Sequence, residues 1–301
     1  MTRPLAEFAA IFGEEPVVER IGSGFDFTEG PVWDPVEGAL YFSDMPGDVR
    51  RRWTEDDGVT EVRRPSNKGN GMAFDARGAL LVCEHSTSRL VREEPDGSTT
   101  VLASHWEGKQ LNSPNDVIVT LSGDVYFTDP TYGRTARFGV EREQELDFQG
   151  VYQIPAGTDR LELVAADFEQ PNGLCMSPDE SVLYVNDTAR GHVRAFRMGP
   201  VGPESRGPVL AEGLGGGDDG VADGMKCDSE GNIYVTGPGG VWVLDPSGDH
   251  LGTIEVPEVV GNLNWGGPDW STLFLTASTS LYRVRTNAVG APVPNMRRGG
   301  P

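Results

Sequence analysis

Six short apolar segments, each ending in a polar or small residue, recur along the chain every 40 to 58 residues, beginning at residues 39, 79, 124, 182, 232 and 272. Their sequences are ALYFSD, ALLVCE, DVYFTD, VLYVND, NIYVTG and TLFLTA, and Gly or Ser directly precedes each one. Short runs rich in Val, Leu, Tyr and Phe that are bounded by turn residues predict β-strands. We call these segments the six hexads.

A repeat of this length is typical of β-propeller blades, which contain four strands each. Six such units occupy nearly all of the 301 residues. We therefore predict an all-β fold, a single six-bladed β-propeller over residues 16–287. The last unit lacks a fourth strand, and residues 17–21 are expected to supply it, so that an N-terminal strand closes the ring. Residues 1–15 are predicted to form an N-terminal extension and residues 288–301 a loose C-terminal tail.

One polar residue stands eight or nine positions before the Gly or Ser of each hexad, and the six are Glu29, Asn70, Asn115, Asn172, Asp223 and Asn262. The first strand of a propeller blade runs along the central axis, so these positions should face one another across the channel. Carboxylate and amide oxygens are the ligands that hard cations such as Ca²⁺ prefer. We predict one divalent cation on the axis, held by Glu29, Asn115, Asn172 and Asp223. Without the cation, one of the two carboxylates is expected to be protonated.

The alternative is that these residues only begin strands, where Asn and Asp are common turn residues. Four oxygen donors at equivalent positions in four units favour a cation site over independent turns. Asn70 and Asn262 share the register, and the sequence leaves open whether they bind a substrate or form turns. His85, directly after the second hexad, is equally open between a cavity position and a structural one.

The third unit contains a polar insertion at residues 134–149. Insertions between propeller strands lie at one face of the fold and often shape a pocket. Tyr132 and Phe138 are therefore candidates to cover a pocket. The Gly-rich run at 213–220 has no strand before it and no helix after it, which indicates a connector rather than a phosphate-binding loop.

The net charge of −21 argues against nucleic acid and anionic membrane surfaces as partners, because both would repel the chain. No apolar run approaches the ~18 residues of a membrane span. The apolar patch near the N-terminus is too short for a signal peptide. The three cysteines show no paired metal spacing, which indicates reduced thiols. We expect a cytoplasmic protein with a small-molecule partner, and no oligomeric state is predicted.

These motifs resemble those of the senescence-marker-protein/gluconolactonase (regucalcin-like) family. The residues that carry the resemblance are EGP from Glu29, ND from Asn115, NG from Asn172 and DGM from Asp223. The segments GKQLNSPNDV at 108–117, YFTDP at 126–130, LVCEH at 81–85 and GVY at 150–152 resemble the bacterial gluconolactonase branch in particular. The resemblance covers residues 16–287.

The resemblance implies a six-bladed propeller with one divalent metal held by Glu29, Asn172 and Asp223. Asn115 would complete the metal shell or meet the substrate and the attacking water. The animal branch places an Arg two residues before this Asn, and Ser113 stands there in this chain, so that contact with a sugar acid is absent. The related diisopropylfluorophosphatases place one Glu, two Asn and one Asp on the same kind of propeller axis. Hydrolysis of a phosphotriester is therefore an alternative activity.

We accordingly expect a metal-dependent lactonase that opens a gluconolactone-like sugar lactone to its hydroxy acid, the metal polarising the carbonyl that water attacks. Asp223 is the first candidate for the base and His85 the second, because the unperturbed pKa of His lies near neutrality. An all-oxygen site favours Ca²⁺ first, with Mg²⁺, Mn²⁺ or Zn²⁺ as alternatives. The other functions considered are an organophosphate or non-sugar lactone hydrolase and a non-catalytic calcium-binding propeller. The candidate substrate-binding residues are Asn115, Asn70, Asn262, Tyr132 and Asp116.

Overall fold

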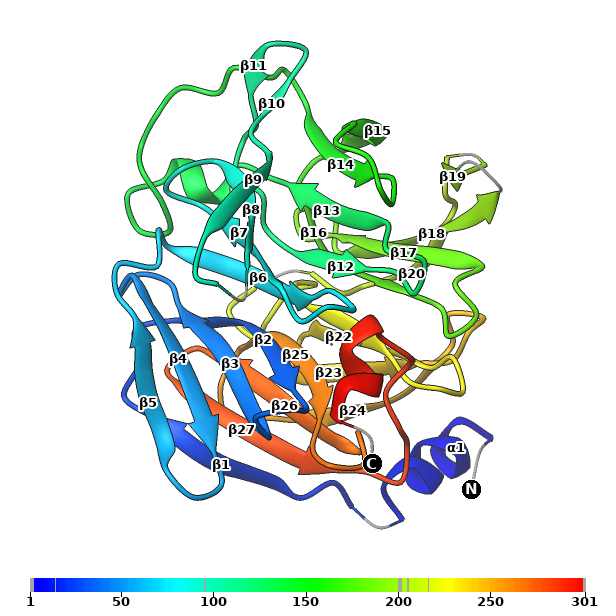
Figure 1. Cartoon of the computed structure of the whole chain (residues 1–301). Helices are drawn as coiled ribbons and strands as arrows, with labels where there is room; N and C mark the ends of the chain where they lie inside the picture. The colour runs from blue at the N-terminus through cyan, green and yellow to red at the C-terminus, as the bar shows by residue number, and fades with distance from the viewer. Residues whose placement is uncertain are drawn as a thin grey trace.

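The computed structural model describes residues 3–13, 15–94, 96–199, 202–204, 206–215 and 217–299. Within these residues, six antiparallel sheets surround a common centre, and the strands of five of them run outward in chain order (Figure 1). The all-β six-bladed propeller is thereby confirmed. The first three blades contain β2 (Thr28–Asp34), β3 (Ala39–Asp44), β4 (Val49–Thr54) and β5 (Gly58–Arg63); β6 (Gly69–Phe74), β7 (Leu80–Glu84), β8 (Arg89–Glu93) and β9 (Thr99–Ala103); and β12 (Val117–Val119), β13 (Val125–Asp129), β14 (Gln149–Ile154) and β15 (Glu162–Phe168).

The fourth blade carries a small additional strand, because both β19 and β20 pair with β18. A separate hairpin of β10 (His105–Trp106) and β11 (Lys109–Gln110) projects between the second and third blades. The last three blades contain β16 (Pro171–Met176), β17 (Val182–Asp187), β18 (His192–Gly199), β19 (Gly202–Pro203) and β20 (Val209–Glu212); β21 (Met225–Cys227), β22 (Ile233–Gly237), β23 (Gly240–Leu244) and β24 (His250–Glu255); and β25 (Val260–Gly266), β26 (Thr272–Ala277), β27 (Ser280–Arg285) and β1 (Val18–Ser23).

The sixth blade combines strands from both ends of the chain. Its outer strand, β1, pairs antiparallel with β27, from Val18 opposite Val284 to Ser23 opposite Ser280. The nearby N-terminal helix α1 (Arg3–Phe12) contacts β24, where Phe8 lies against Gly252. Ile11 of this helix is buried in an apolar cluster that the first, fifth and sixth blades share. The N-terminal extension therefore packs on the propeller.

All six hexads form the second strand of their blade, as β3, β7, β13, β17, β22 and β26. Each of these strands has at most one residue that is not buried. Neighbouring blades cover both faces of the strand, so its apolar run is continuous rather than alternating. The ring of Trp33 in the first blade, for example, stacks on Phe274 in the sixth at a centroid distance of 5.4 Å. The strand prediction from the hexads is correct in all six blades.

The first strands are irregular where the axial residues lie. The pairing register shifts between Glu29 and Val32, between Gly69 and Met72, between Pro171 and Leu174, and between Val260 and Asn262. A β-bulge of this kind bends the strand and re-aims its side chains, and bulges are common beside active sites. Asn70 and Asn172 lie within such an irregularity, and Glu29 and Asn262 lie directly beside one.

In three blades, the aspartate at the end of the hexad accepts hydrogen bonds from the backbone that leads into the first strand of the same blade. Asp44 accepts hydrogen bonds from the backbone N–H groups of Asp26 and Phe27, just before Glu29. In the third and fourth blades, Asp129 and Asp187 bind two backbone N–H groups each, at residues 112–113 and 169–170. Because these donors lie two or three residues before the axial residue, the hexad carboxylates fix where the axial side chains start.

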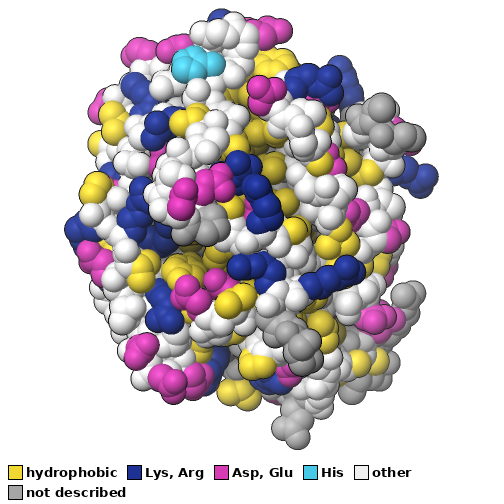
Figure 2. Space-filling model, in the orientation of Figure 1, with side chains coloured by type: hydrophobic (Ala, Val, Ile, Leu, Met, Phe, Trp, Pro, Cys, Tyr) yellow, Lys and Arg dark blue, Asp and Glu magenta, His cyan; other side chains and the backbone are white. Residues whose placement is uncertain are grey.

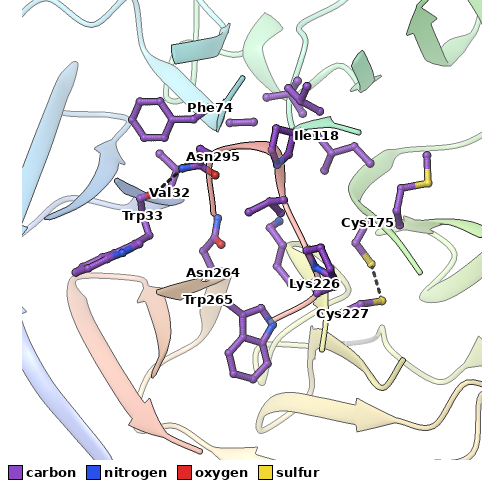
Figure 3. A pocket seen from close by; sticks show the side chains of 18 of the residues that line it. Val32, Trp33, Phe74, Ile118, Cys175, Lys226, Cys227, Asn264, Trp265 and Asn295 are labelled. Carbon is purple, nitrogen blue, oxygen red and sulfur yellow. Dashed lines mark hydrogen bonds between the residues drawn. The ribbon is translucent and has the colours of Figure 1, made fainter. Parts of the chain in front are cut away.

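The C-terminal segment is not loose. Backbone hydrogen bonds join Gly290 to Trp270 and Ala291 to Cys227. The Asn295 amide donates to the Trp33 carbonyl at 2.9 Å. Figure 3 shows this segment crossing a cavity lined by the far ends of the first strands, with Lys226 beside it. The expectation of a loose tail at 288–301 is wrong for residues 288–298, because Pro292, Val293 and Pro294 cover apolar channel walls.

We predict that deleting residues 289–301 lowers the free energy of unfolding by about 3 kcal/mol or more, since it exposes apolar surface around Trp265 and Trp270. Urea unfolding followed by tryptophan fluorescence measures this loss. Arg297→Ala, at an exposed position of the same segment, serves as the control and should change little. Equal unfolding midpoints for the truncated and full chains would contradict the packing described here.

Two observations bear on partners. No helix among the described residues is long and apolar enough to cross a membrane. On the face drawn in Figure 2, basic and acidic side chains are interspersed, so that face offers no continuous basic surface for a nucleic acid.

Candidate metal centre

A pocket of about 130 Å³ lies at the end of the channel where the first strands begin. It collects seven of the residues that the sequence nominated, drawn from five blades. They are Glu29, Asn70, His85, Asn115, Tyr132, Asn172 and Asp223. Phe138, from the insertion, lines it as well. The register of the repeat thus brings together side chains that are up to 194 positions apart in the sequence, from Glu29 to Asp223.

Asn262 and Asp116 do not line this pocket but lie buried beside it. The Asn262 amide donates to Glu29 Oε2 at 3.0 Å. Asp116 Oδ1 accepts from the backbone N–H of Val117, and its Oδ2 lies 3.7 Å from Lys226 Nζ. Both side chains therefore have partners within the protein. Asn262 and Asp116 are thus placed to support the axial carboxylates. Their contact with a substrate stays a prediction.

Two amides turn their oxygen atoms away from every protein donor. Asn172 donates through Nδ2 to Thr188 Oγ1 at 3.0 Å, and Asn70 Nδ2 lies 3.4 Å from His85 Nε2. The Oδ1 atoms of both residues are buried and have no hydrogen-bond partner within the described chain. A buried carbonyl oxygen without a donor is costly unless something else meets it.

The orientation of His85 follows from its neighbours. Its Nδ1 lies 3.1 Å from the carbonyl oxygen of Phe138, which can only accept, so Nδ1 carries the proton. Nε2 is then the acceptor that faces Asn70 Nδ2. This chain of contacts fixes which end of the Asn70 amide points into the pocket.

The two carboxylates are held in an environment that disfavours their negative charge. Burial raises the pKa of Glu29 to about 7, although hydrogen bonds from Gly30 N–H and Asn262 oppose the shift. Burial also raises the pKa of Asp223 well above its usual range, and the neighbouring charges of Glu29 and Asp116 add to the effect. A cation between them would reverse this balance, because it favours the ionised forms.

The donor set fits a hard divalent cation. The carboxylates of Glu29, which is buried, and Asp223, which is half-buried, face one pocket with at least two unpartnered amide oxygens, and oxygen ligands of mixed charge are what Ca²⁺ takes. Within the described residues, no cluster of three or more His, Cys, Asp or Glu side chains could hold a metal. A site rich in amides therefore matches Ca²⁺ or Mg²⁺ better than the nitrogen and sulfur ligands of zinc.

His85 is a weaker base than its unperturbed pKa, on which its candidacy rested, would make it. Burial lowers the pKa of this imidazole to about 4, so the side chain is neutral and weakly basic at neutral pH. Its free nitrogen also faces Asn70. The position of His85 suits orientation of the Asn70 amide better than removal of a proton from water.

Several pocket residues were missed by the reading of the sequence. Met45 and Thr188 follow their hexads directly, in the same register as His85. Phe27 and Val221 stand two positions before Glu29 and Asp223. The repeat therefore contained the signal for all four, because residues at equivalent places in different blades reach the same end of the channel.

Thr188 lets the orientation of Asn172 be tested. Its hydroxyl accepts from Asn172 Nδ2 and donates to the Ala222 carbonyl at 2.6 Å. We predict that Thr188→Val weakens Ca²⁺ binding by about tenfold, because the amide loses the partner that turns its oxygen inward. Calorimetric titration measures the dissociation constant. Thr188→Ser keeps the hydroxyl and should restore the affinity, whereas equal weakening by both variants would show that the hydroxyl does not orient Asn172.

The fold and the site define a class of protein, a six-bladed propeller with an oxygen-rich pocket at one end of its axis. Residues 27–279 match the family described as the SMP-30/Gluconolactonase/LRE-like region. The chain belongs to this family. The resemblance drawn from the motifs is thereby confirmed.

Individual relatives agree with this assignment. The chain is 34% identical over 308 residues to a gluconolactonase of Zymomonas mobilis, covering 93% of this chain and 84% of that protein. The solved structure of a gluconolactonase from Xanthomonas campestris matches with a TM-score of 0.86 and 32% identity, covering 93% of this chain and 92% of the other. A regucalcin structure from Agrobacterium tumefaciens, described as a calcium-binding protein, shares the fold with a TM-score of 0.77 at 20% identity, covering 95% and 99% of the two chains.

Proposed function

We propose that the protein is a metal-dependent lactonase that hydrolyses an uncharged sugar lactone of the gluconolactone kind to its hydroxy acid. The observation that carries the proposal is the convergence of the Glu29 and Asp223 carboxylates with the unpartnered oxygens of Asn70 and Asn172 in one pocket. The gluconolactonases among the relatives support the reaction class. The pocket is not fully enclosed, so a small molecule can enter it.

Glu29, Asn172 and Asp223, with Asn115, are the proposed ligands of one divalent cation, for which Ca²⁺ is the first choice. The structure adds Asn70 as a further oxygen donor facing the same space. When bound, the cation would polarise the lactone carbonyl and stabilise the negative charge that develops on its oxygen.

The side chains then divide the remaining tasks. Asp223 is the proposed general base, because its carboxylate lies in the pocket and a neighbouring cation would keep it ionised. Asn115 lines the pocket, and its side chain makes none of the hydrogen bonds found within the described residues. Its amide is therefore free to orient the lactone or the attacking water. Tyr132 lines the same pocket and is the proposed substrate contact at its wall.

Two structural proposals accompany this function. The pairing of β1 with β27 supports closure of the ring by the N-terminal segment. All three cysteines are buried and form no disulfide, which supports a reducing, cytoplasmic location.

Turnover of a substrate panel by the Ca²⁺-loaded protein tests the reaction class. Acid release from glucono-1,5-lactone should exceed the spontaneous rate and scale with protein concentration. Hydrolysis of an aryl dialkyl phosphate, measured in parallel, reports the phosphotriesterase alternative. Acceleration of the phosphate ester without any acceleration of the lactone would refute the proposal.

A further inference from the structure

The pocket combines the polar axial residues with a set of apolar side chains, which we call the apolar wall. The oxygen donors occupy the channel end, while Phe27, Met45, Phe138 and Val221 line the space above them. Phe27 and Met45 come from the first blade, Val221 from the fifth and Phe138 from the insertion at 134–149, so the apolar surface is a wall built from several segments rather than one isolated contact. Sugar hydroxyl groups find few hydrogen-bonding partners on such a wall.

Contacts within the protein hold this wall in place. The rings of Phe27 and Phe138 meet edge to face at a centroid distance of 5.4 Å. The backbone N–H of Phe27 is bound by Asp44, and its carbonyl accepts from Met45 N–H. The carbonyl of Phe138 accepts from His85 Nδ1. Because both rings belong to hydrogen-bonded segments, the wall exists before any ligand enters.

None of the described residues that line the pocket is Lys or Arg. Three cations near it are bound elsewhere. Lys226, whose charge acts on Glu29, donates to the Met225 carbonyl at 3.0 Å and lies 3.7 Å from Asp116 Oδ2. Lys68 Nζ donates to the carbonyls of Ala136 and Arg137 at 3.1 and 3.0 Å. Arg142 donates to the carbonyls of His85 and Val140, both at 2.9 Å. Lys68 and Arg142 fasten the insertion over the pocket.

Two other polar residues near the pocket, Ser113 and Arg137, are not positioned to meet an anionic substrate. Ser113 is buried, donates to the Pro130 carbonyl at 2.6 Å and accepts from Gly133 N–H at 2.9 Å. Arg137 is exposed, with its guanidinium 5.2 Å from the centre of the Phe138 ring, and does not line the pocket. A carboxylate or phosphate on a substrate would therefore lose water without gaining a protein cation.

From these observations we propose a further activity: the site hydrolyses uncharged lactones that carry a hydrocarbon substituent, which the Phe27–Phe138 wall binds, and it discriminates against lactones that carry an anionic group. The proposal rests on the lactonase function above and adds the substituent that the wall selects. In the reaction, water adds to the ester carbonyl, the bond between the acyl carbon and the ring oxygen breaks, and the proton released by water ends on that oxygen. The product is a hydroxy acid with the hydrocarbon group retained, and no other reactant is consumed.

Two matched pairs of lactones test the proposal with the Ca²⁺-loaded protein. δ-Decalactone differs from δ-valerolactone by a pentyl chain, and kcat/KM should be about tenfold or more higher for δ-decalactone, since each buried methylene favours binding by up to about fourfold. Glucaro-1,4-lactone carries a carboxylate where glucono-1,4-lactone carries a hydroxymethyl group, and its kcat/KM should be about a hundredfold lower, since no Lys or Arg side chain of the pocket compensates the buried charge.

Variants connect the preference to the wall. Phe138→Ala should lower kcat/KM for δ-decalactone by about tenfold and change that for δ-valerolactone by less than about threefold, because it removes contact with the chain alone. Phe27→Leu provides a second, smaller truncation of the same wall. Val140→Ala alters an exposed residue of the same insertion and should leave both values unchanged.

The outcomes separate this inference from the proposed function. Turnover of glucono-1,5-lactone combined with no gain from the pentyl chain would overturn the inference and leave the lactonase function standing. Equal rates for the two sugar lactones would overturn the charge discrimination. If no lactone of any kind is hydrolysed, both the function and the inference fall.

Discussion

Asp223→Asn should lower kcat/KM for lactone hydrolysis by about a thousandfold or more. The substitution keeps an oxygen donor of the same shape but removes the negative charge that helps hold a divalent cation and that accepts a proton from water. Loss of a general base or of electrostatic stabilisation costs about a hundred- to a thousandfold each. Steady-state kinetics with a range of Ca²⁺ concentrations measures the effect and separates weakened metal binding from slower chemistry.

Asp219→Asn is the matched control. Asp219 lies four positions away on the exposed part of the Gly-rich connector, and its substitution should leave kcat/KM unchanged. If Asp223→Asn retained near-full turnover at saturating Ca²⁺, the role of this carboxylate as base would be wrong.

Glu29→Gln should have opposite effects on the metal-free and metal-bound protein. Burial raises the pKa of Glu29 from 4.5 to about 7, so the folded metal-free protein keeps a proton that the unfolded chain releases. The free energy of unfolding of the metal-free protein therefore falls as pH rises from about 5 to about 8, by up to about 3 kcal/mol from this group. Glutamine carries no charge, so the variant should lose that part of the pH dependence and be more stable than the parent at pH 8, yet bind Ca²⁺ at least about a hundredfold more weakly.

Urea unfolding in the presence of chelator, measured at several pH values, tests the first effect, and calorimetric titration tests the second. Glu37→Gln, at an exposed turn of the same blade, controls for a general effect of removing negative charge. A parent protein whose metal-free stability increases with pH over this interval would contradict the buried, unpaired state of Glu29.

The parts of this structure that could be predicted from the sequence are those that repeat. The hexads predict the second strands because a strand covered on both faces must be apolar throughout, and that pattern is local. The axial residues could be identified because each stands eight or nine positions before the Gly or Ser that precedes its hexad. The ring of blades then brings these equivalent positions close together in space. Met45 and Thr188 directly follow their hexads, as His85 does, so the same comparison of equivalent positions would have predicted that they line the pocket beside it.

What could not be predicted depends on contacts that occur only once. The C-terminal segment covers the channel through Pro292, Val293 and Asn295, and its sequence shows no periodic pattern that indicates burial. The pKa of His85 is set by depth in the protein and by the carbonyl of Phe138, which comes from an irregular insertion 53 positions away. The apolar wall depends on the same insertion. Side chains on irregular segments are placed by tertiary packing, which the local pattern does not encode.

Removal and replacement of the metal tests the central claim most directly. The protein is stripped with a chelator, and acid release from glucono-1,5-lactone is followed as Ca²⁺, Mg²⁺, Mn²⁺ or Zn²⁺ is added back. We predict that activity falls to about 1% or less without metal and returns with one bound ion per chain, most fully with Ca²⁺, because the donors in the pocket are all oxygens. Lactone hydrolysis that continues unchanged in the metal-free protein would contradict the account.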